Sequence, residues 1–266
     1  MTQASLTPSQ RRASLALRSG IALQASTLAW LAWRHGTSVD SLLFMELGTS
    51  EALAGAVDRA LSTVSLLAAL CLLVAPQRGA ALMVLPVSAA FLIEALALRT
   101  IGGRAYAELA PVAHATRWLA PLALLWLRTP PSDVATGRAS WILRVAVVAT
   151  FCTHGFEAWR QHPAFVDLLI GSARRWTDSA PTEDTARLVL IAIAVLDGLV
   201  ALALVVGGFT ARWRWIALWA TLWGLLTAAA RPVALGPEFV HEGTIRALNG
   251  LAPLALWYLS PRPEHT

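Results

Sequence analysis

The sequence predicts an all-α, polytopic membrane protein in which eight transmembrane helices form two parallel four-helix repeats. Hydrophobic residues make up 56% of the 266 residues and charged residues only 14%, against about 25% in an ordinary soluble domain. A soluble chain of this composition could not cover its surface with polar groups. Eight apolar runs approach the roughly 20 residues that a helix needs to cross a bilayer, and the second half repeats motifs of the first.

The first half begins with a basic tail, residues 1–13, which we expect to stay in the cytoplasm. The apolar runs that follow are long and do not alternate with polar residues, so strands are excluded. Inside lipid a helix satisfies its own backbone hydrogen bonds. The turn Pro76–Arg78 predicts a tight hairpin between the second and third helices. The four runs are Ser14–Trp33, Ala52–Val74, Gly79–Leu98 and Tyr106–Leu127.

The second half begins after a linker, residues 129–140, that contains Pro130, Pro131 and Gly137. Its first and second runs are separated by a longer loop, Arg160–Thr185. A tight hairpin at Thr210–Arg212 joins its second and third runs. The four runs are Trp141–Ala158, Ala186–Gly208, Trp213–Ala230 and Pro237–Leu259.

The two halves share motifs in the same order. Trp33-Arg34 aligns with Trp159-Arg160 at an offset of 126 residues, and Leu119–Leu124 matches Leu251–Leu256 at an offset of 132. Because each copy has an even number of helices, both enter the membrane from the same side, as in a parallel repeat. The predicted units are residues 14–128 for the first repeat and 141–260 for the second, with a tail at 261–266.

The charges predict the orientation in the membrane. The half of the bundle with the termini carries ten Arg and two acidic residues, and the opposite half carries eleven Arg and fourteen acidic residues. The basic tail and the short basic turns decide the orientation under the positive-inside rule. We therefore expect a multi-pass protein of the inner (plasma) membrane with both termini in the cytoplasm.

Polar side chains inside the runs predict a pocket that opens to the outer face. Charges at depth are costly, so they usually face a bundle interior or a wet cavity. We expect both repeats to contribute, with more weight on the second. The candidate ligand-binding residues are His154, Glu157, Asp197, Arg231, His241, Glu242, Arg246, Asn249, His114 and Arg117.

An alternative interpretation is that these groups only pair with one another and hold the two copies together. Glu242 precedes Arg246 by four residues, the favourable order for an ion pair on a helix. His154 and Glu157 share a face in the same way. Trp215, Trp219 and Trp223 also recur every four residues, and we favour a lipid-facing or packing stripe over a site that stacks on the rings of a ligand.

No motif predicts a metal centre or an enzyme that acts alone. The sequence contains no His-Glu-x-x-His and no Cys-x-x-Cys. Two His on facing helices could ligate haem, but nothing in their spacing requires it, so we expect no haem. Quinone is the candidate cofactor, and the basic residues are too scattered between apolar runs to predict nucleic-acid binding.

Six motifs of the second repeat follow one another in a characteristic order: Arg144, Thr153–Trp159, Leu196–Gly198, Gly207–Thr210, Leu222–Ala228 and Arg231-Pro232. Through these motifs the second repeat resembles the DoxX-like membrane proteins over roughly 144–259. The resemblance implies a four-helix membrane unit that serves redox systems, such as thiosulfate–quinone oxidoreduction, together with partner proteins. The single-repeat relatives would have to dimerise to make what this chain makes alone.

Three functions stay open. The first is a non-catalytic membrane subunit of an oxidoreductase complex that binds a quinone- or lipid-like molecule in the polar pocket. The second is a transporter of a small solute, coupled to protons or not. We expect no Gly or Pro interruption at matching mid-membrane positions, which counts against this second function. The third is a structural or assembly subunit of a membrane complex.

Overall fold

The computed structural model describes residues 6–74, 80–101, 103, 105–127, 132–207 and 214–261, and these residues form helices and no strand. The first half contains α1 Pro8–Arg34, α2 Ser38–Ser41, η1 Leu42–Glu46, α3 Glu51–Val74, α4 Ala80–Thr100, η2 Ala107–Leu109, α5 Ala110–Ala113, α6 Ala115–Trp118 and η3 Ala120–Leu125. The second half contains α7 Asp133–Trp159, α8 Pro163–Thr177, α9 Glu183–Val206, α10 Arg214–Leu235, η5 Pro237–Phe239, α11 Val240–Thr244 and α12 Ala247–Leu259. The all-α prediction is therefore confirmed for the described residues.

Five of the described helices are long and apolar enough to cross a membrane: α3, α4 from Leu82, α7, α9 and α10. Their outward faces carry large apolar side chains, such as Leu67 on α3, 57% exposed, and Leu199 on α9, 58% exposed. Contiguous apolar surface of this kind is stable against lipid and not against water. The structure thus supports a membrane protein with transmembrane helices.

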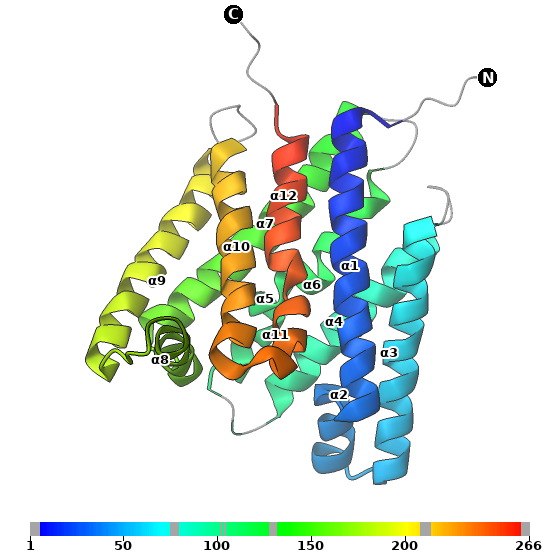
Figure 1. Cartoon of the computed structure of the whole chain (residues 1–266). Coiled ribbons are helices and arrows are strands. Elements are labelled where there is room, and N and C mark those ends of the chain that lie inside the picture. Colours follow the sequence, from blue (N-terminus) through cyan, green and yellow to red (C-terminus); the bar gives the residue numbers. More distant parts are fainter. Residues whose placement is uncertain are drawn as a thin grey trace, which may run out of the picture.

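Equivalent helices pack against equivalent partners in the two halves. The opening helix of each half, α1 or α7, packs against the second long helix of its own half, α3 or α9. It also packs against the closing segment of the other half, α1 against α12 and α7 against α5, α6 and η3 (Figure 1). The shared core between them includes Leu17, Ile21, Leu143, Val147 and Leu256. The repeat boundaries themselves stay a prediction.

The beginning of α1 and the end of α12 lie at the same end of the molecule (Figure 1). A capping box between Thr7 and Gln10 starts α1 there, with each side chain accepting a hydrogen bond from the other residue's backbone N–H. The predicted hairpins Pro76–Arg78 and Thr210–Arg212, residues 128–131 around the beginning of the linker, and the tail from 262 lie outside the described residues.

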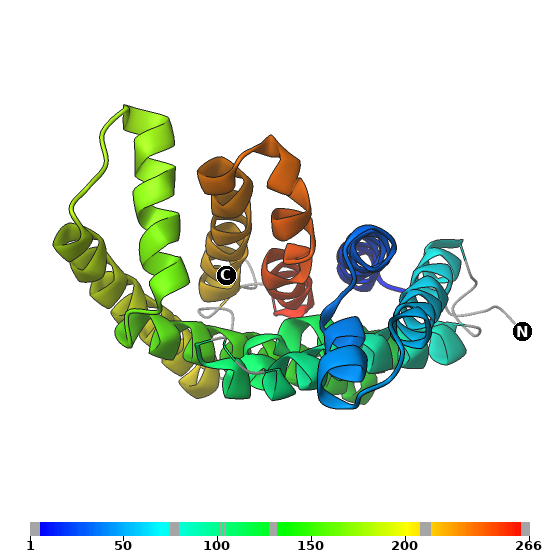
Figure 2. The same ribbon diagram turned by 90° about the horizontal axis from the view of Figure 1, so that it is seen from below.

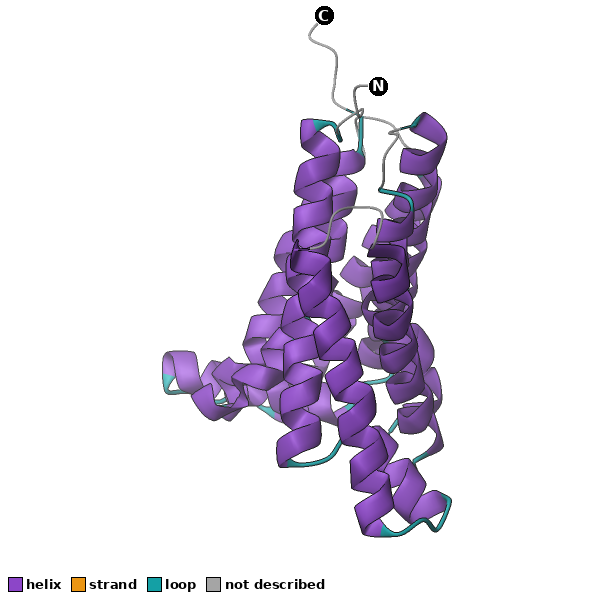
Figure 3. Ribbon diagram, turned by 90° about the vertical axis from the view of Figure 1, so that its right-hand side faces the viewer, coloured by secondary structure: helices purple, strands orange, loops and turns teal. Residues whose placement is uncertain are grey.

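The predicted loop Arg160–Thr185 is wrong, because most of it is the amphipathic helix α8. Pro163 occupies the first turn of α8, and the ring of His162 accepts a hydrogen bond from the N–H of Ala164. The helix lies crosswise to the long helices at the end away from the start of α1 (Figures 2 and 3). Its apolar residues Val166 and Leu169 pack against α7 and α9, as in a helix that lies at a membrane interface.

The fourth and eighth apolar runs, each predicted as one helix, are broken at matching positions. The breaks lie at His114, between α5 and α6, and near Arg246, between α11 and α12. These residues are 132 apart, the offset that aligns the two halves here. The N–H of Arg117 bonds the carbonyl of His114, and the N–H of Asn249 bonds that of Arg246, both at 2.9 Å. The prediction that each of these runs forms one continuous helix is therefore wrong. The expectation about Gly or Pro interruptions at mid-membrane positions stays a prediction.

A proline follows each break at the same distance along the chain. Pro121 and Pro253 occupy equivalent positions and have no N–H to donate to the carbonyl four residues earlier. Those carbonyls belong to Arg117 and Asn249, the residues that close the two tight turns. In the first half the chain continues as the 3-10 helix η3, and in the second as α12.

Candidate functional site

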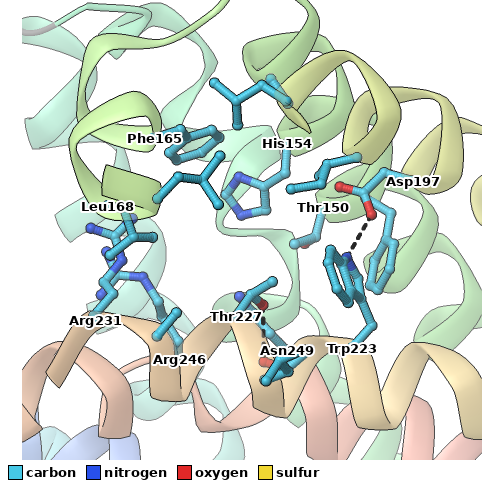
Figure 4. A pocket seen from close by; sticks show the side chains of 18 of the residues that line it. Thr150, His154, Phe165, Leu168, Asp197, Trp223, Thr227, Arg231, Arg246 and Asn249 are labelled. Atoms are coloured by element: carbon cyan, nitrogen blue, oxygen red, sulfur yellow. Dashed lines mark hydrogen bonds between the residues drawn. The ribbon is translucent and has the colours of Figure 1, made fainter. Parts of the chain in front are cut away.

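A cavity of about 240 Å³ lies between α7, α8, α9, α10 and the break before α12 (Figure 4). All the elements that line it belong to the second half, at the end of the bundle where α8 lies. Most of its wall is apolar and comes from Phe151, Phe165, Leu168, Leu169, Leu190, Ile193 and Leu226. The polar lining residues therefore stand out as the groups that could orient a ligand.

Two arginines line one side of the cavity. Arg231 comes from the last turns of α10, and Arg246 lies at the break before α12 (Figure 4). The Nη1 of Arg246 donates to Oε2 of Glu242 at 2.7 Å and also to the backbone carbonyl of Glu242. The predicted Glu242–Arg246 pair is thus confirmed.

His154 enters the cavity from α7. Its Nδ1 lies 3.0 Å from Oε2 of Glu157, one turn along the same helix. Glu157 does not line the cavity and is buried behind the ring. This contact lets the carboxylate orient the imidazole, whose other nitrogen is left for a ligand.

Asp197 and Trp223 lie across the cavity from the two arginines (Figure 4). The indole Nε1 of Trp223 donates to Oδ1 of Asp197 at 2.8 Å, and Asp197 is only 5% exposed. The close crossing of α7 and α9 at Gly155 brings Asp197 here, because a Cβ on Gly155 would lie 3.2 Å from that of Asp197. The Asp–Trp pair joins α9 to α10.

The first half reaches the site through Thr116. Its Oγ1 donates to Oδ1 of Asn249 at 2.7 Å, and its N–H donates to Oγ1 of Thr150 at 3.2 Å. Thr150 and Asn249 both line the cavity. The broken fourth segment therefore supports the lining from behind without entering it.

The remaining candidates lie outside the cavity lining. Arg117 and His114 come from the broken fourth segment, and both interact electrostatically with Arg231 and Arg246. The ring of His241 lies 4.8 Å from that of Trp30, and its Nε2 lies 4.0 Å from Oε1 of Glu242. Of the predicted residues, the cavity thus collects His154, Asp197, Arg231, Arg246 and Asn249, while Glu157 and Glu242 each contact one of these.

In the first half, Asp58 of α3 and Glu94 of α4 hold the segment after α1. Asp58 accepts hydrogen bonds from the N–H of Thr37 at 2.9 Å and from its hydroxyl at 2.5 Å. Glu94 accepts from the N–H groups of Ser38 and Val39. Hydrogen bonds to a buried carboxylate stabilise the local fold and leave it few free lone pairs.

Sequence reasoning missed Trp223 and the residues of α8. Trp215 and Trp219 are exposed, as expected of a lipid-facing stripe, but Trp223 lines the cavity. The indole donor of a buried Trp needs an acceptor, so a Trp one helix away from a buried Asp was the available signal. Phe165 and Leu168 were missed because their segment was taken for a loop.

No group of three or more His, Cys, Asp or Glu in the described parts of the chain is placed to hold a metal ion. No protein-family model, no curated protein and no solved structure matches the chain. The resemblance to the DoxX-like proteins therefore stays a prediction.

Proposed function

We propose that this protein is an integral membrane subunit that binds a quinone- or lipid-like molecule in the cavity of its second half. The observation that carries the proposal is one cavity with apolar walls on most sides and His154, Asp197, Arg231 and Arg246 at its polar positions. Such a combination suits a ligand with an apolar body and a polar head. The proposal includes eight spans in an inner membrane and both termini in the cytoplasm, as the apolar runs and the basic turns predict. It also includes a redox partner protein, as the DoxX resemblance implies.

The polar groups would have distinct roles. His154 would hydrogen-bond the polar head of the ligand, with its ring oriented by Glu157. Arg231 and Arg246 would provide charge-assisted donors, which stabilise a reduced or anionic form of a head group. The apolar residues of α8 would cover the body of the ligand, because Phe165 and Leu168 line the cavity.

The test is a binding titration with decylubiquinone on the purified chain in phosphatidylcholine nanodiscs. We expect His154→Ala and Arg246→Ala each to weaken binding about tenfold or more, the usual effect of a lost charge-assisted hydrogen bond. Arg187→Ala is the control, because Arg187 pairs with Glu183 on the exposed face of α9, outside the cavity. Unchanged affinity in both variants would exclude this cavity as the quinone site. Co-purification of a stable complex with a redox enzyme would support the proposal of a redox partner protein.

The matching breaks at His114 and Arg246 favour transport as a second candidate function. Many transporters bind their substrates where helices of two repeats are interrupted at corresponding positions. The test is solute uptake by proteoliposomes under an imposed pH gradient. Absence of uptake for every candidate solute, with the protein correctly inserted, would reject this candidate.

A further inference from the structure

Positive charge is concentrated around one side of the cavity. Arg231 and Arg246 line it, and Arg117 approaches from the broken fourth segment. The acidic groups that interact with Arg231 are Glu242 and Glu157, and those that interact with Arg117 are Glu242 and Glu94, so three guanidinium groups share three carboxylates. Glu94 already accepts hydrogen bonds from two backbone N–H groups after α1. Glu242 is already paired with Arg246, and Glu157 with His154.

Two of the three arginines lack a direct acidic partner. Among the residues that the structure describes, neither Arg117 nor Arg231 has a carboxylate within 4.0 Å. Arg117 is only 7% exposed, and its buried Nε has no hydrogen-bond acceptor. A buried charge without a partner is costly, so proteins normally retain one only where something compensates it.

The break before α12 adds to this positive potential. The helix begins at Ala247 with Arg246 as its N-cap, and no side chain accepts a hydrogen bond there. The backbone N–H groups at a helix N-terminus carry a partial positive charge that favours anions. The N-terminus of α12 and the arginines therefore both favour the binding of an anion.

We propose that the ligand is an amphipathic anion whose carboxylate or phosphate head lies against Arg231 and Arg246. Arg117 would complete the positive field behind them, and the apolar body would lie among Phe151, Phe165 and Ile193. This inference rests on the proposed function and narrows it from any quinone- or lipid-like molecule to one with a negatively charged head. Carboxylate and phosphate share the chemistry that Arg recognises, which is planar, charge-assisted hydrogen bonding.

The experiment measures displacement of radiolabelled palmitate from the full chain in phosphatidylcholine nanodiscs. The competitors are palmitate, hexadecyl phosphate, hexadecanol, inorganic phosphate and decylubiquinone. We expect the two long-chain anions to bind at least about tenfold tighter than hexadecanol, which has the same chain and no charge. Inorganic phosphate has the charge without the chain and should bind weakly. The ratio of palmitate to hexadecyl phosphate identifies the preferred head.

Variants separate a ligand-binding role from a structural one. Arg231→Gln should weaken palmitate binding about tenfold or more, and Arg231→Lys should restore part of it. Glu242→Gln removes the acid that competes for Arg246, so anion affinity should rise, an effect that a purely structural role would not produce. Arg187→Gln is the control, because Arg187 pairs with Glu183 on the exposed face of α9.

Two outcomes would overturn the inference in different ways. Suppose that hexadecanol or decylubiquinone competes as well as palmitate and that the Arg231 variants bind palmitate normally. The inference of an anionic head group is then refuted, while the proposal that the cavity binds a ligand is retained. If decylubiquinone binds in the cavity in a direct titration and palmitate does not bind, the inference of an anionic head group is likewise refuted. If neither palmitate nor decylubiquinone binds to the folded protein, the proposed function itself fails.

Discussion

The crossing of α10 over α12 depends on Gly224, and Gly224→Ala tests it. A Cβ at this position would lie 2.2 Å from the carbonyl oxygen of Asn249 and 2.9 Å from the backbone nitrogen of Gly250. Ordinary contacts of a Cβ begin near 3.4 Å, so the two helices would have to separate by about 1.2 Å. Both clashing partners are backbone atoms, so no side-chain rotation can relieve the contact. The same carbonyl is the one that Pro253 leaves without a helical donor.

We expect Gly224→Ala to lower the free energy of unfolding by about 2 kcal/mol, within the usual cost of overpacking a tight contact. For a chain of this size that corresponds to roughly 4–8 °C in Tm. The assay is thermal unfolding followed by tryptophan emission in nanodiscs. Because Asn249 and Gly224 both line the cavity, ligand binding should weaken in the same variant.

Two other glycines in long helices serve as graded controls. A Cβ on Gly198 of α9 would meet nothing within 4 Å, so Gly198→Ala should be neutral or slightly stabilising. A Cβ on Gly155 would lie 3.2 Å from the Cβ of Asp197 and 3.3 Å from the carbonyl of Ala194, so Gly155→Ala should fall between the two. A Gly224→Ala protein as stable as Gly198→Ala would refute the close crossing.

Two further predictions concern the Asp–Trp pair and the orientation of the chain in the membrane. Trp223→Phe removes the donor to buried Asp197 and should cost about 1–3 kcal/mol in thermal unfolding, whereas an unchanged Tm would mean that the carboxyl has another partner. In a protein whose native cysteines are replaced, Asp178→Cys should react with an impermeant maleimide on intact cells, and Ser9→Cys only after lysis. Labelling of Ser9→Cys on intact cells would contradict a cytoplasmic N-terminus.

Much of the framework could be predicted because it depends on local composition. Runs of apolar residues near the length of a bilayer core indicate helices whatever their neighbours are, and five described helices long enough to cross a membrane lie on those runs. The Glu242–Arg246 pair was also predictable, since both residues lie within one turn of chain. The collection of His154, Asp197 and Arg231 in one cavity followed only in outline, from the cost of charge inside a membrane.

The features that were missed depend on contacts between distant segments. The donation from Trp223 to Asp197 joins two helices, and no spacing along one helix predicts it. The breaks at His114 and Arg246 were missed because each run continues as apolar sequence after the polar residues and is long enough in total for one span. Their signal was the pair of prolines that follow at Pro121 and Pro253, which read as tolerated residues of a membrane helix.

The asymmetry of the site follows from how each half holds its segment after the opening helix. In the first half Asp58 and Glu94 accept hydrogen bonds from the backbone of Thr37, Ser38 and Val39, so these acids are engaged in holding that segment. In the second half His162 and a proline start α8 without any carboxylate. Glu157 and Asp197 therefore stay available to the interior, where they position His154 and Trp223. The same broken scaffold can thus hold a ligand site in one half and a structural network in the other.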